Sequence, residues 1–285
     1  MGKPKAQGLA LLYGDAEPGL RETDVLSGGK PLSAVAVPAV ADLNVYCINL
    51  KRSPRRRAYM EQQAEREGVV VTFVEAIDGT ELDLAQIAEY NSAERRARFG
   101  WDLAATEVAT ALSHRKALAA IRDAGHDRAV VLEDDAEILP GFKDVVSALY
   151  RRDDLDFDIV RLCGARNRSG RLVTLLDATH SLERPYRPMC GLQAYMVNAA
   201  SIDRVIRSFI PITMQIDVAL DRFWENDLKI LSVRPFVALP SHAFDSDVAA
   251  TGDQWRQERK LFRLNLRARR ALDHIKRTRY ILRSF

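Results

Sequence analysis

Residues 129–135 read AVVLEDD, an apolar run followed directly by three carboxylates. Four apolar residues rich in valine predict a short buried strand. The acidic residues Glu133, Asp134 and Asp135 cannot belong to the core, because unpaired buried carboxylates are too costly. Hard oxygen ligands at a strand end suit Mn²⁺ or Mg²⁺, which usually neutralises a substrate diphosphate. The alternative is a solvated acidic turn before Pro140-Gly141.

The chain before this strand predicts a βαβ unit. Residues 44–50 are expected to form a strand, and a helix follows with Ser53 as its N-cap and Pro54 at its first position. Gly68 suits the C-terminal cap of that helix, and a second strand is expected at 69–73. Strand, helix and strand at this spacing are typical of a βαβ unit.

Further elements continue the alternation. A polar helical region is expected around 83–100, and a helix capped by Thr106 should end at Gly125. Later strands are expected at 158–162, 194–197, 230–233 and 236–239, and helices at 200–209 and 217–225. The pattern predicts an α/β fold with a mixed, mostly parallel sheet flanked by helices. In such sheets ligands bind at the carboxyl ends of strands, so 49–52 and the acidic triplet could face one cleft.

Length and charge suggest three regions. The chain has 285 residues, a length that fits one large domain with appendages. Its net charge is +3. Residues 1–42 show no sustained periodicity and are expected to be a poorly ordered extension. Residues 43–250 form the expected main domain, and 251–285 an amphipathic helical tail. Residues 256–285 carry eleven Lys/Arg and two acidic residues, a net of +9 against −6 for the rest.

The basic tail has three interpretations. It could lie on an anionic membrane surface, bind nucleic acid, or pack as a helix on the domain. No apolar run reaches the ~20 residues needed to span a bilayer. We therefore expect a cytoplasmic protein that is peripheral on the inner face of the plasma membrane if the tail binds lipid. Cys47, Cys163 and Cys190 predict reduced thiols, because no CxxC motif is present.

Arginines surround the start of the first helix, at positions 52, 55, 56 and 57. Backbone N–H groups at a helix N-terminus favour an anion, and guanidiniums add bidentate phosphate contacts. The alternative is a solvated basic face. The chain contains no GxxxxGK[ST] motif, and no GxGxxG follows the first strand. With the P-loop and dinucleotide-binding classes excluded, the arginines and carboxylates fit a nucleotide-sugar transferase. A metal-dependent phosphohydrolase that uses the same carboxylates is the alternative.

Five segments in order resemble glycosyltransferase family 25, the bacterial lipooligosaccharide and lipopolysaccharide galactosyltransferases related to collagen galactosyltransferases: 48–57, 75–79, 107–114, 131–136 and 191–197. The resemblance implies a GT-A type, Rossmann-like fold and metal-dependent, inverting transfer from a UDP-sugar. UDP-galactose is the usual donor in the family. The acceptor would be a lipooligosaccharide, lipopolysaccharide or other envelope glycan, including a lipid-linked oligosaccharide, and no nucleic acid partner is expected.

The resemblance also implies roles for individual residues. Glu133 and Asp135 occupy the place of the DxD motif of GT-A enzymes, and His242 could complete the sphere of the metal, Mn²⁺ or Mg²⁺. The residues expected at the donor or nucleotide are Asn49, Arg52, Arg56, Ala76, Asp78, Ser113, His114, Asp134, Gln193 and Tyr195. Asp134 could point elsewhere, since alternate residues in an extended segment face opposite sides. For His114 the alternative is a half-buried histidine whose ring nitrogens are hydrogen-bonded within the protein and have no functional role.

An inverting transferase needs a general base for the acceptor hydroxyl. Asp217 and Asp221 are four residues apart on one helix face, and Asp217 at the helix start is the favoured base. The alternative is that Asp217 merely caps the helix. Gln193 replaces the second glycine of the family's Gly-x-Gly-Ala-Tyr pattern, which narrows the expected sugar pocket. An inactive GT-A-fold protein associated with membrane or glycan is therefore the alternative function.

Overall fold

The computed structural model describes residues 43–241, 243–244 and 263–284. The predicted extension 1–42, the first part of the basic tail and His242 lie outside these ranges. Among the described helices, none combines the length and apolar character that a membrane crossing requires.

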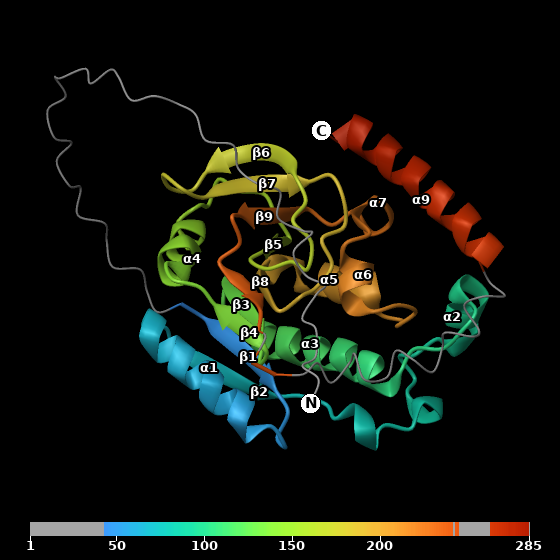
Figure 1. The fold of residues 1–285 in the computed structure, drawn as a ribbon, viewed down its shortest axis with the longest axis horizontal. Coiled ribbons are helices and arrows are strands. Elements are labelled where there is room, and N and C mark those ends of the chain that lie inside the picture. The colour runs from blue at the N-terminus through green and yellow to red at the C-terminus, as the bar shows by residue number, and fades with distance from the viewer. Residues whose placement is uncertain (1–42, 242, 245–262, 285) are drawn as a thin grey trace, which may run out of the picture. The chain divides into compact units, whose positions relative to one another are not determined.

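An eight-stranded sheet lies at the centre of the described chain, in the order β2-β1-β3-β8-β5-β9-β7-β6 (Figure 1). The strands are β1 (Val45–Asn49), β2 (Val71–Glu75), β3 (Arg128–Glu133), β5 (Ile159–Arg161), β6 (Gly170–Leu175), β7 (Ser181–Pro185), β8 (Ala194–Asn198) and β9 (Ile230–Arg234). All strands of this sheet run the same way except β7 and β8. The prediction of a mixed, mostly parallel sheet flanked by helices is confirmed.

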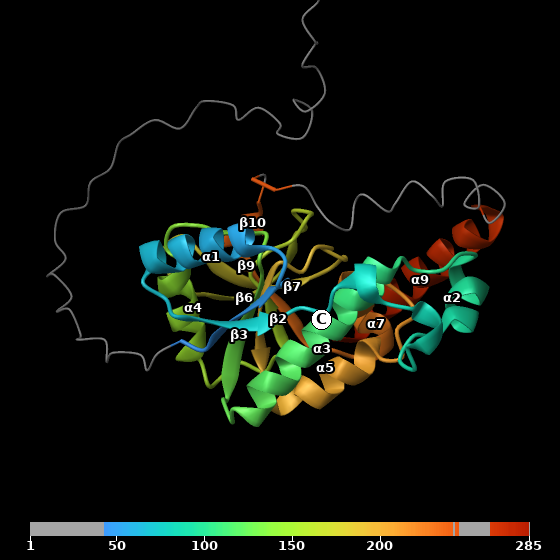
Figure 2. The same ribbon diagram turned by 90° about the horizontal axis from the view of Figure 1, so that it is seen from below.

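Helices cover both faces of the sheet. In Figures 1 and 2, α1 and α4 lie on one face, and α3 and α5 lie on the other. The helices are α1 (Pro54–Glu67), α2 (Ser92–Phe99), α3 (Ala105–Asp123), α4 (Phe142–Tyr150), α5 (Ile202–Phe209), α6 (Ile216–Leu220), α7 (Phe223–Asn226) and α9 (Arg263–Ser284). Short 3₁₀ turns are η1 (Gly79–Glu81), η2 (Leu84–Gln86) and η3 (Ala199–Ser201), and β4 (Ala136–Ile138) pairs with β10 (Ala238–Pro240).

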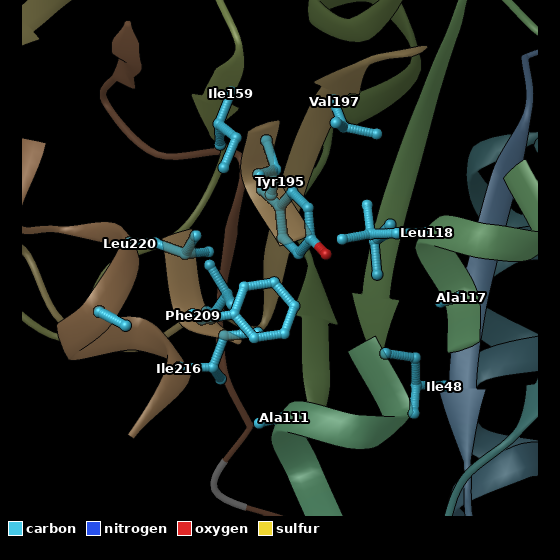
Figure 3. Close-up of a cluster of buried hydrophobic side chains, with 14 of the residues drawn as sticks. Ile48, Ala111, Ala117, Leu118, Ile159, Tyr195, Val197, Phe209, Ile216 and Leu220 are labelled. Atoms are coloured by element: carbon cyan, nitrogen blue, oxygen red, sulfur yellow. The ribbon is translucent and has the colours of Figure 1, made fainter. Parts of the chain in front are cut away.

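The core has two halves, one on each side of the sheet. Successive strand side chains point to opposite faces, so Val130 and Leu132 pack with α1 and α4, while Val131 packs with α3 and α5. Because helices cover both faces of the sheet, these strands are apolar throughout and do not alternate between apolar and polar residues. Figure 3 shows Tyr195 of β8 surrounded by apolar side chains, including Leu118 of α3 and Phe209 of α5.

The first βαβ unit is confirmed. Strands β1 and β2 are parallel, and Gly68 ends α1 in the left-handed region at φ 63°. Ser53 occupies the N-cap position of α1, as predicted, but makes no side-chain capping bond. The predicted cap of α3 is wrong, because the helix begins at Ala105 and Ala104, not Thr106, is its N-cap. There the Glu107 carboxylate accepts from the Ala104 N–H at 2.8 Å.

The sequence patterns did not predict α4 or the β6–β7 hairpin. The hairpin lies at the sheet edge, and Leu172 and Leu175 of β6 are exposed, so no alternating buried pattern marks it. Helix α4 begins directly after Pro140-Gly141, a pair of residues that indicates a turn in the sequence.

Candidate functional site

The carboxyl ends of β1, β2 and β3 meet at one edge of the sheet. Asn49 is aligned with Glu75, and Ile48 with Glu133, because the three strands are parallel neighbours. A hollow of about 100 Å³ lies here between the strand ends, the start of α1 and helix α3. The predicted site residues that line it are Arg52, Arg56, Ala76, Ser113, His114, Glu133, Asp134 and Asp135.

The Asp134 carboxylate is held by two protein partners. Its carboxylate accepts from Asn49 Nδ2 at 2.7 Å and from Arg56 Nη1 at 3.1 Å. Burial raises the pKa of Asp134, and these two partners act against that shift. Asn49 is itself buried. Asn49 and Asp134 therefore brace the acidic turn, and Arg56 links that turn to the first helix.

Asp135 has an unpartnered carboxylate oxygen. Its Oδ1 atom is buried and has no hydrogen-bond partner among the described residues. Burial, with the neighbouring carboxylates of Glu133 and Asp134, raises the pKa of Asp135 to about 7. Buried polar atoms normally have partners, so this oxygen points to a missing donor or cation.

Thr106 carries a second unpartnered polar atom in the same hollow. Its Oγ1 is buried without a hydrogen bond in the described structure, although the side chain sits in the first turn of α3. Thr110 also lines the hollow, and its hydroxyl donates to the Thr106 carbonyl at 2.9 Å. These two threonines, one helical turn apart, are cleft residues that sequence reasoning missed. Their spacing beside the expected Ser113-His114 pair was the available signal.

His114 connects the acidic turn to the core. Its Nε2 lies 3.1 Å from Glu133 Oε1 and its Nδ1 lies 3.1 Å from the Tyr195 hydroxyl. Both His114 and Tyr195 are fully buried, and burial raises the pKa of the tyrosine hydroxyl. Tyr195 lies behind His114 within the core, and its expected contact with the donor sugar stays a prediction.

Arg52 pairs with Asp78 at the rim. The Arg52 guanidinium donates to both carboxylate oxygens, and its hydrogen bond is the main reason why the pKa of Asp78 is lowered to about 2. Ser113 is buried and holds the adjacent turn, since its hydroxyl accepts from Ile77 N–H at 2.8 Å.

Gly79 also fixes the turn against α3. A Cβ atom at Gly79 would lie 2.5 Å from Thr106 Cα, so only glycine allows this approach. The backbone N–H of Ala76 donates to the Asn49 carbonyl at 2.9 Å, which places this turn beside the end of β1.

The two predicted catalytic aspartates have different environments. Asp221 is 2% exposed and its Oδ1 lies 2.6 Å from Arg161 Nη1, while its Oδ2 accepts from the Met189 and Cys190 amides. The Asp221 carboxylate therefore forms a buried ion pair with Arg161, and its expected catalytic role stays a prediction. Asp217 is only partly buried and accepts from Gly191 N–H at 2.9 Å.

Gln193 lies beside the acidic strand end. Its backbone carbonyl accepts from Glu133 N–H at 2.9 Å, and its side-chain Oε1 is 3.6 Å from Cys163 Sγ. The described residues contain no group of three His, Cys, Asp or Glu side chains arranged to hold a metal. His242 is outside them, but its neighbour Ser241 donates its N–H to the Asp135 carbonyl at 2.8 Å.

Comparison with known proteins gives one family. The model for "Glycosyltransferase family 25 (LPS biosynthesis protein)" matches residues 42–220, more than half of the chain. Two curated relatives are 25% identical over 220 residues, which is 70% of this chain: "Probable inactive glycosyltransferase 25 family member 3" of Rattus norvegicus and "Inactive glycosyltransferase 25 family member 3" of Mus musculus. The matched region spans 38% and 37% of these relatives, respectively.

Two solved structures show weak likeness. A glycosyltransferase involved in glycosylation of the major capsid of PBCV-1 has a TM-score of 0.31 at 8% identity, over 59% of this chain and 66% of that chain. The inositol-1-phosphate CTP transferase from T. maritima has a TM-score of 0.38 at 11% identity, over 78% of this chain and 96% of that chain.

Proposed function

Because the chain belongs to glycosyltransferase family 25, we propose that it transfers a hexose from a UDP-sugar to a glycan acceptor, with a divalent metal at the acidic turn. Galactose is the proposed sugar, and the proposed acceptor is an envelope glycan of the lipooligosaccharide or lipopolysaccharide class. A lipid-linked acceptor would bring the protein to the inner face of the plasma membrane.

One observation carries the proposal. Two buried polar atoms without partners, Asp135 Oδ1 and Thr106 Oγ1, line one hollow at the carboxyl ends of parallel strands. An unsatisfied buried polar atom costs about 1–3 kcal/mol, so a ligand that pairs with both would be favoured. Arg52 and Arg56 line the same hollow and would attract a diphosphate. At about 100 Å³ the hollow accounts for only part of a donor, because ligand pockets typically measure roughly 300–1,000 Å³.

The residues present fit a hard divalent cation such as Mn²⁺ or Mg²⁺. Asp135 offers an unpartnered carboxylate oxygen, and Glu133 brings a second carboxylate held by His114. His242 is proposed as a further ligand, one residue after the segment that hydrogen-bonds to Asp135. When bound, such a metal neutralises the diphosphate charge that develops on the leaving group. The protein's own part is to hold Glu133 and Asp135 in position and to bring Arg52 and Arg56 to the phosphates.

Asp217 is the proposed general base. Its carboxylate is partly exposed, and its Oδ2 atom retains lone-pair capacity beyond the bond from Gly191. The next residue, Val218, lines a second hollow of about 1150 Å³ between α2 and α9 that also contains Phe99 and Trp101. Apolar ring faces there would pack against a sugar ring. This hollow is the proposed path of the acceptor, whose hydroxyl would transfer its proton to Asp217.

The test compares donor binding in matched variants. Thermal unfolding is measured with UDP-galactose, UDP-glucose, UDP-GlcNAc and GDP-mannose, each with and without Mn²⁺. A donor at 100 times its Kd should stabilise by about 2.7 kcal/mol, a shift of a few degrees. Asp135→Asn should abolish the metal-dependent shift, whereas Asp144→Asn, an exposed aspartate on α4, should retain it. An unchanged shift in Asp135→Asn would show that the metal site is misassigned.

A second function is a non-catalytic protein that keeps the fold. The two curated relatives are described as inactive, and the Gln193 side chain lies next to Gly191 at the strand end, where its bulk would crowd a sugar. This alternative predicts that a donor binds but UDP is not released. Release of UDP with Mn²⁺ and any acceptor would exclude it.

A further inference from the structure

A third hollow lies where α9 meets the base of the β6–β7 hairpin. Its volume is about 580 Å³. One wall comes from the residues just before β6 and just after β7, and the other comes from α9. In Figure 1, α9 (red) runs along the side of the domain past α7 and this hairpin. The polar residues that line it include Arg168, Ser169, Arg187, His274, Arg277 and Thr278.

The charge of this hollow is one-sided. Three arginines line it, and no carboxylate is among the described residues that do so. Arg168 Nε is buried without a hydrogen-bond partner, and Arg187 is exposed with no ion pair in the described structure. Burial, together with the nearby charge of Arg187, lowers the pKa of Arg277, and the Asp273 carboxylate acts against that shift. Three arginines with no carboxylate among the described lining residues favour an anionic ligand.

The neighbouring polar groups suit a phosphate group. Arg277 Nη2 donates to His274 Nδ1 at 3.1 Å, so this ring nitrogen accepts and the other can carry a proton for donation. Ser169 and Thr278 add hydroxyl donors. Guanidinium forks with several further donors match the oxygens of a tetrahedral phosphate.

We propose that this hollow binds a phosphate group, carried either by a soluble phosphorylated molecule or by a lipid headgroup. The site is distinct from the acidic cleft, since its lining shares no residue with that hollow. It gives α9 a specific role, because Arg277, His274 and Thr278 all come from this helix.

The test measures binding of inorganic phosphate to the full chain by titration calorimetry. A titration with sodium chloride of equal ionic strength is the reference. Arg168→Gln and Arg187→Gln should each weaken phosphate binding about tenfold or more, because each removes a charge-assisted contact. Arg279→Gln is the control, since it removes an exposed arginine of α9 that does not line the hollow. Its affinity should stay within about twofold of the wild type, in the range expected for a surface charge.

Phosphate could also bind at Arg52 and Arg56, so the variants decide the location. Unchanged affinity in both Arg168→Gln and Arg187→Gln would overturn the proposal. Arg187 is exposed, so its variant remains informative if Arg168→Gln fails to fold by circular dichroism.

Vesicles distinguish the two sources of phosphate. Phosphatidylcholine vesicles with and without phosphatidic acid are compared with inorganic phosphate and glycerol phosphate. Binding only to phosphatidic acid vesicles, lost in Arg187→Gln and kept in Arg279→Gln, would assign a headgroup. Binding of the soluble phosphates with the same variant pattern would assign a soluble ligand. Equal losses in Arg187→Gln and Arg279→Gln would show diffuse charge attraction and overturn the site.

Discussion

His114 Nε2 lies 3.1 Å from Glu133 Oε1, and this contact joins the hydrophobic core to the candidate active site. On its other side His114 Nδ1 is 3.1 Å from the Tyr195 hydroxyl. If Tyr195 donates to Nδ1, the imidazole carries its proton on Nε2 and donates it to Glu133. A buried tyrosine would thereby fix the orientation of a carboxylate proposed to bind metal.

Tyr195→Phe should destabilise the protein by about 1–3 kcal/mol, because it leaves a buried ring nitrogen without a partner. Chemical denaturation gives the free energy of unfolding. Tyr46→Phe is the control, since Tyr46 is also buried in a strand but makes no hydrogen bond through its hydroxyl in the described structure. Equal losses in the two variants would mean that the Tyr195–His114 contact contributes nothing specific.

Asp221→Asn should destabilise the protein by about 3–5 kcal/mol, because it removes the charge partner of the fully buried Arg161. Thermal and urea unfolding measure the loss. Asp203→Asn breaks an exposed pair with Arg122 and should cost less than about 1 kcal/mol. Normal stability together with lost activity in Asp221→Asn would instead support a catalytic role.

Asp217→Asn should lower kcat by about 10²–10⁴-fold if Asp217 is the general base. Asparagine keeps one oxygen to accept from Gly191 N–H but loses the acceptor for Val218 N–H, so the stability loss should be about 0.5–1.5 kcal/mol. The readouts are UDP release and thermal unfolding in parallel. A large stability loss with a normal kcat per folded molecule would favour a capping role for Asp217.

Asp78→Asn should lower stability at neutral pH by less than about 1 kcal/mol, because Asp78 pairs with a half-exposed Arg52. The folded pKa of Asp78 is lowered to about 2 from 3.8, so its contribution is present above about pH 4 and is lost as pH falls through about 2. Denaturation from pH 2 to 7 should therefore show the variant and the wild type converging at low pH. Asp83→Asn, a nearby exposed turn residue, should not reproduce this convergence.

Asp273→Asn should loosen α9 from the domain. Arg222 donates to Asp273 at 3.0 Å, and Arg222 is largely buried between α7 and α9. A charge-assisted bond of this kind contributes about 1.5–3 kcal/mol, so amides in 263–284 should exchange faster in hydrogen-exchange mass spectrometry. Arg279→Gln on the same helix should leave exchange unchanged, and unaltered protection in Asp273→Asn would refute the docking role.

Much of the fold and part of the site could be predicted from local sequence signals. The apolar run before Glu133 and the proline and glycine around α1 are local signals, and the structure places β3 and α1 there. The position of the cleft could be predicted from strand direction alone, because neighbouring parallel strands end at the same edge of the sheet. The β6–β7 hairpin at the sheet edge was not predicted, because it depends on β6 pairing with β7 and β7 pairing with β9, and no local sequence pattern records such pairing.

The sequence by itself determined the α/β class, the strand ends that meet at the cleft and the presence of carboxylates there, since these follow from periodicity and strand order. Only the tertiary structure decided what each polar side chain does. Asp134 is bound by Asn49 and Arg56, Asp221 by Arg161, and Asp135 alone of the triplet keeps a buried oxygen without a partner among the described residues. Residues adjacent in sequence differ in this way because burial and partners come from segments far along the chain.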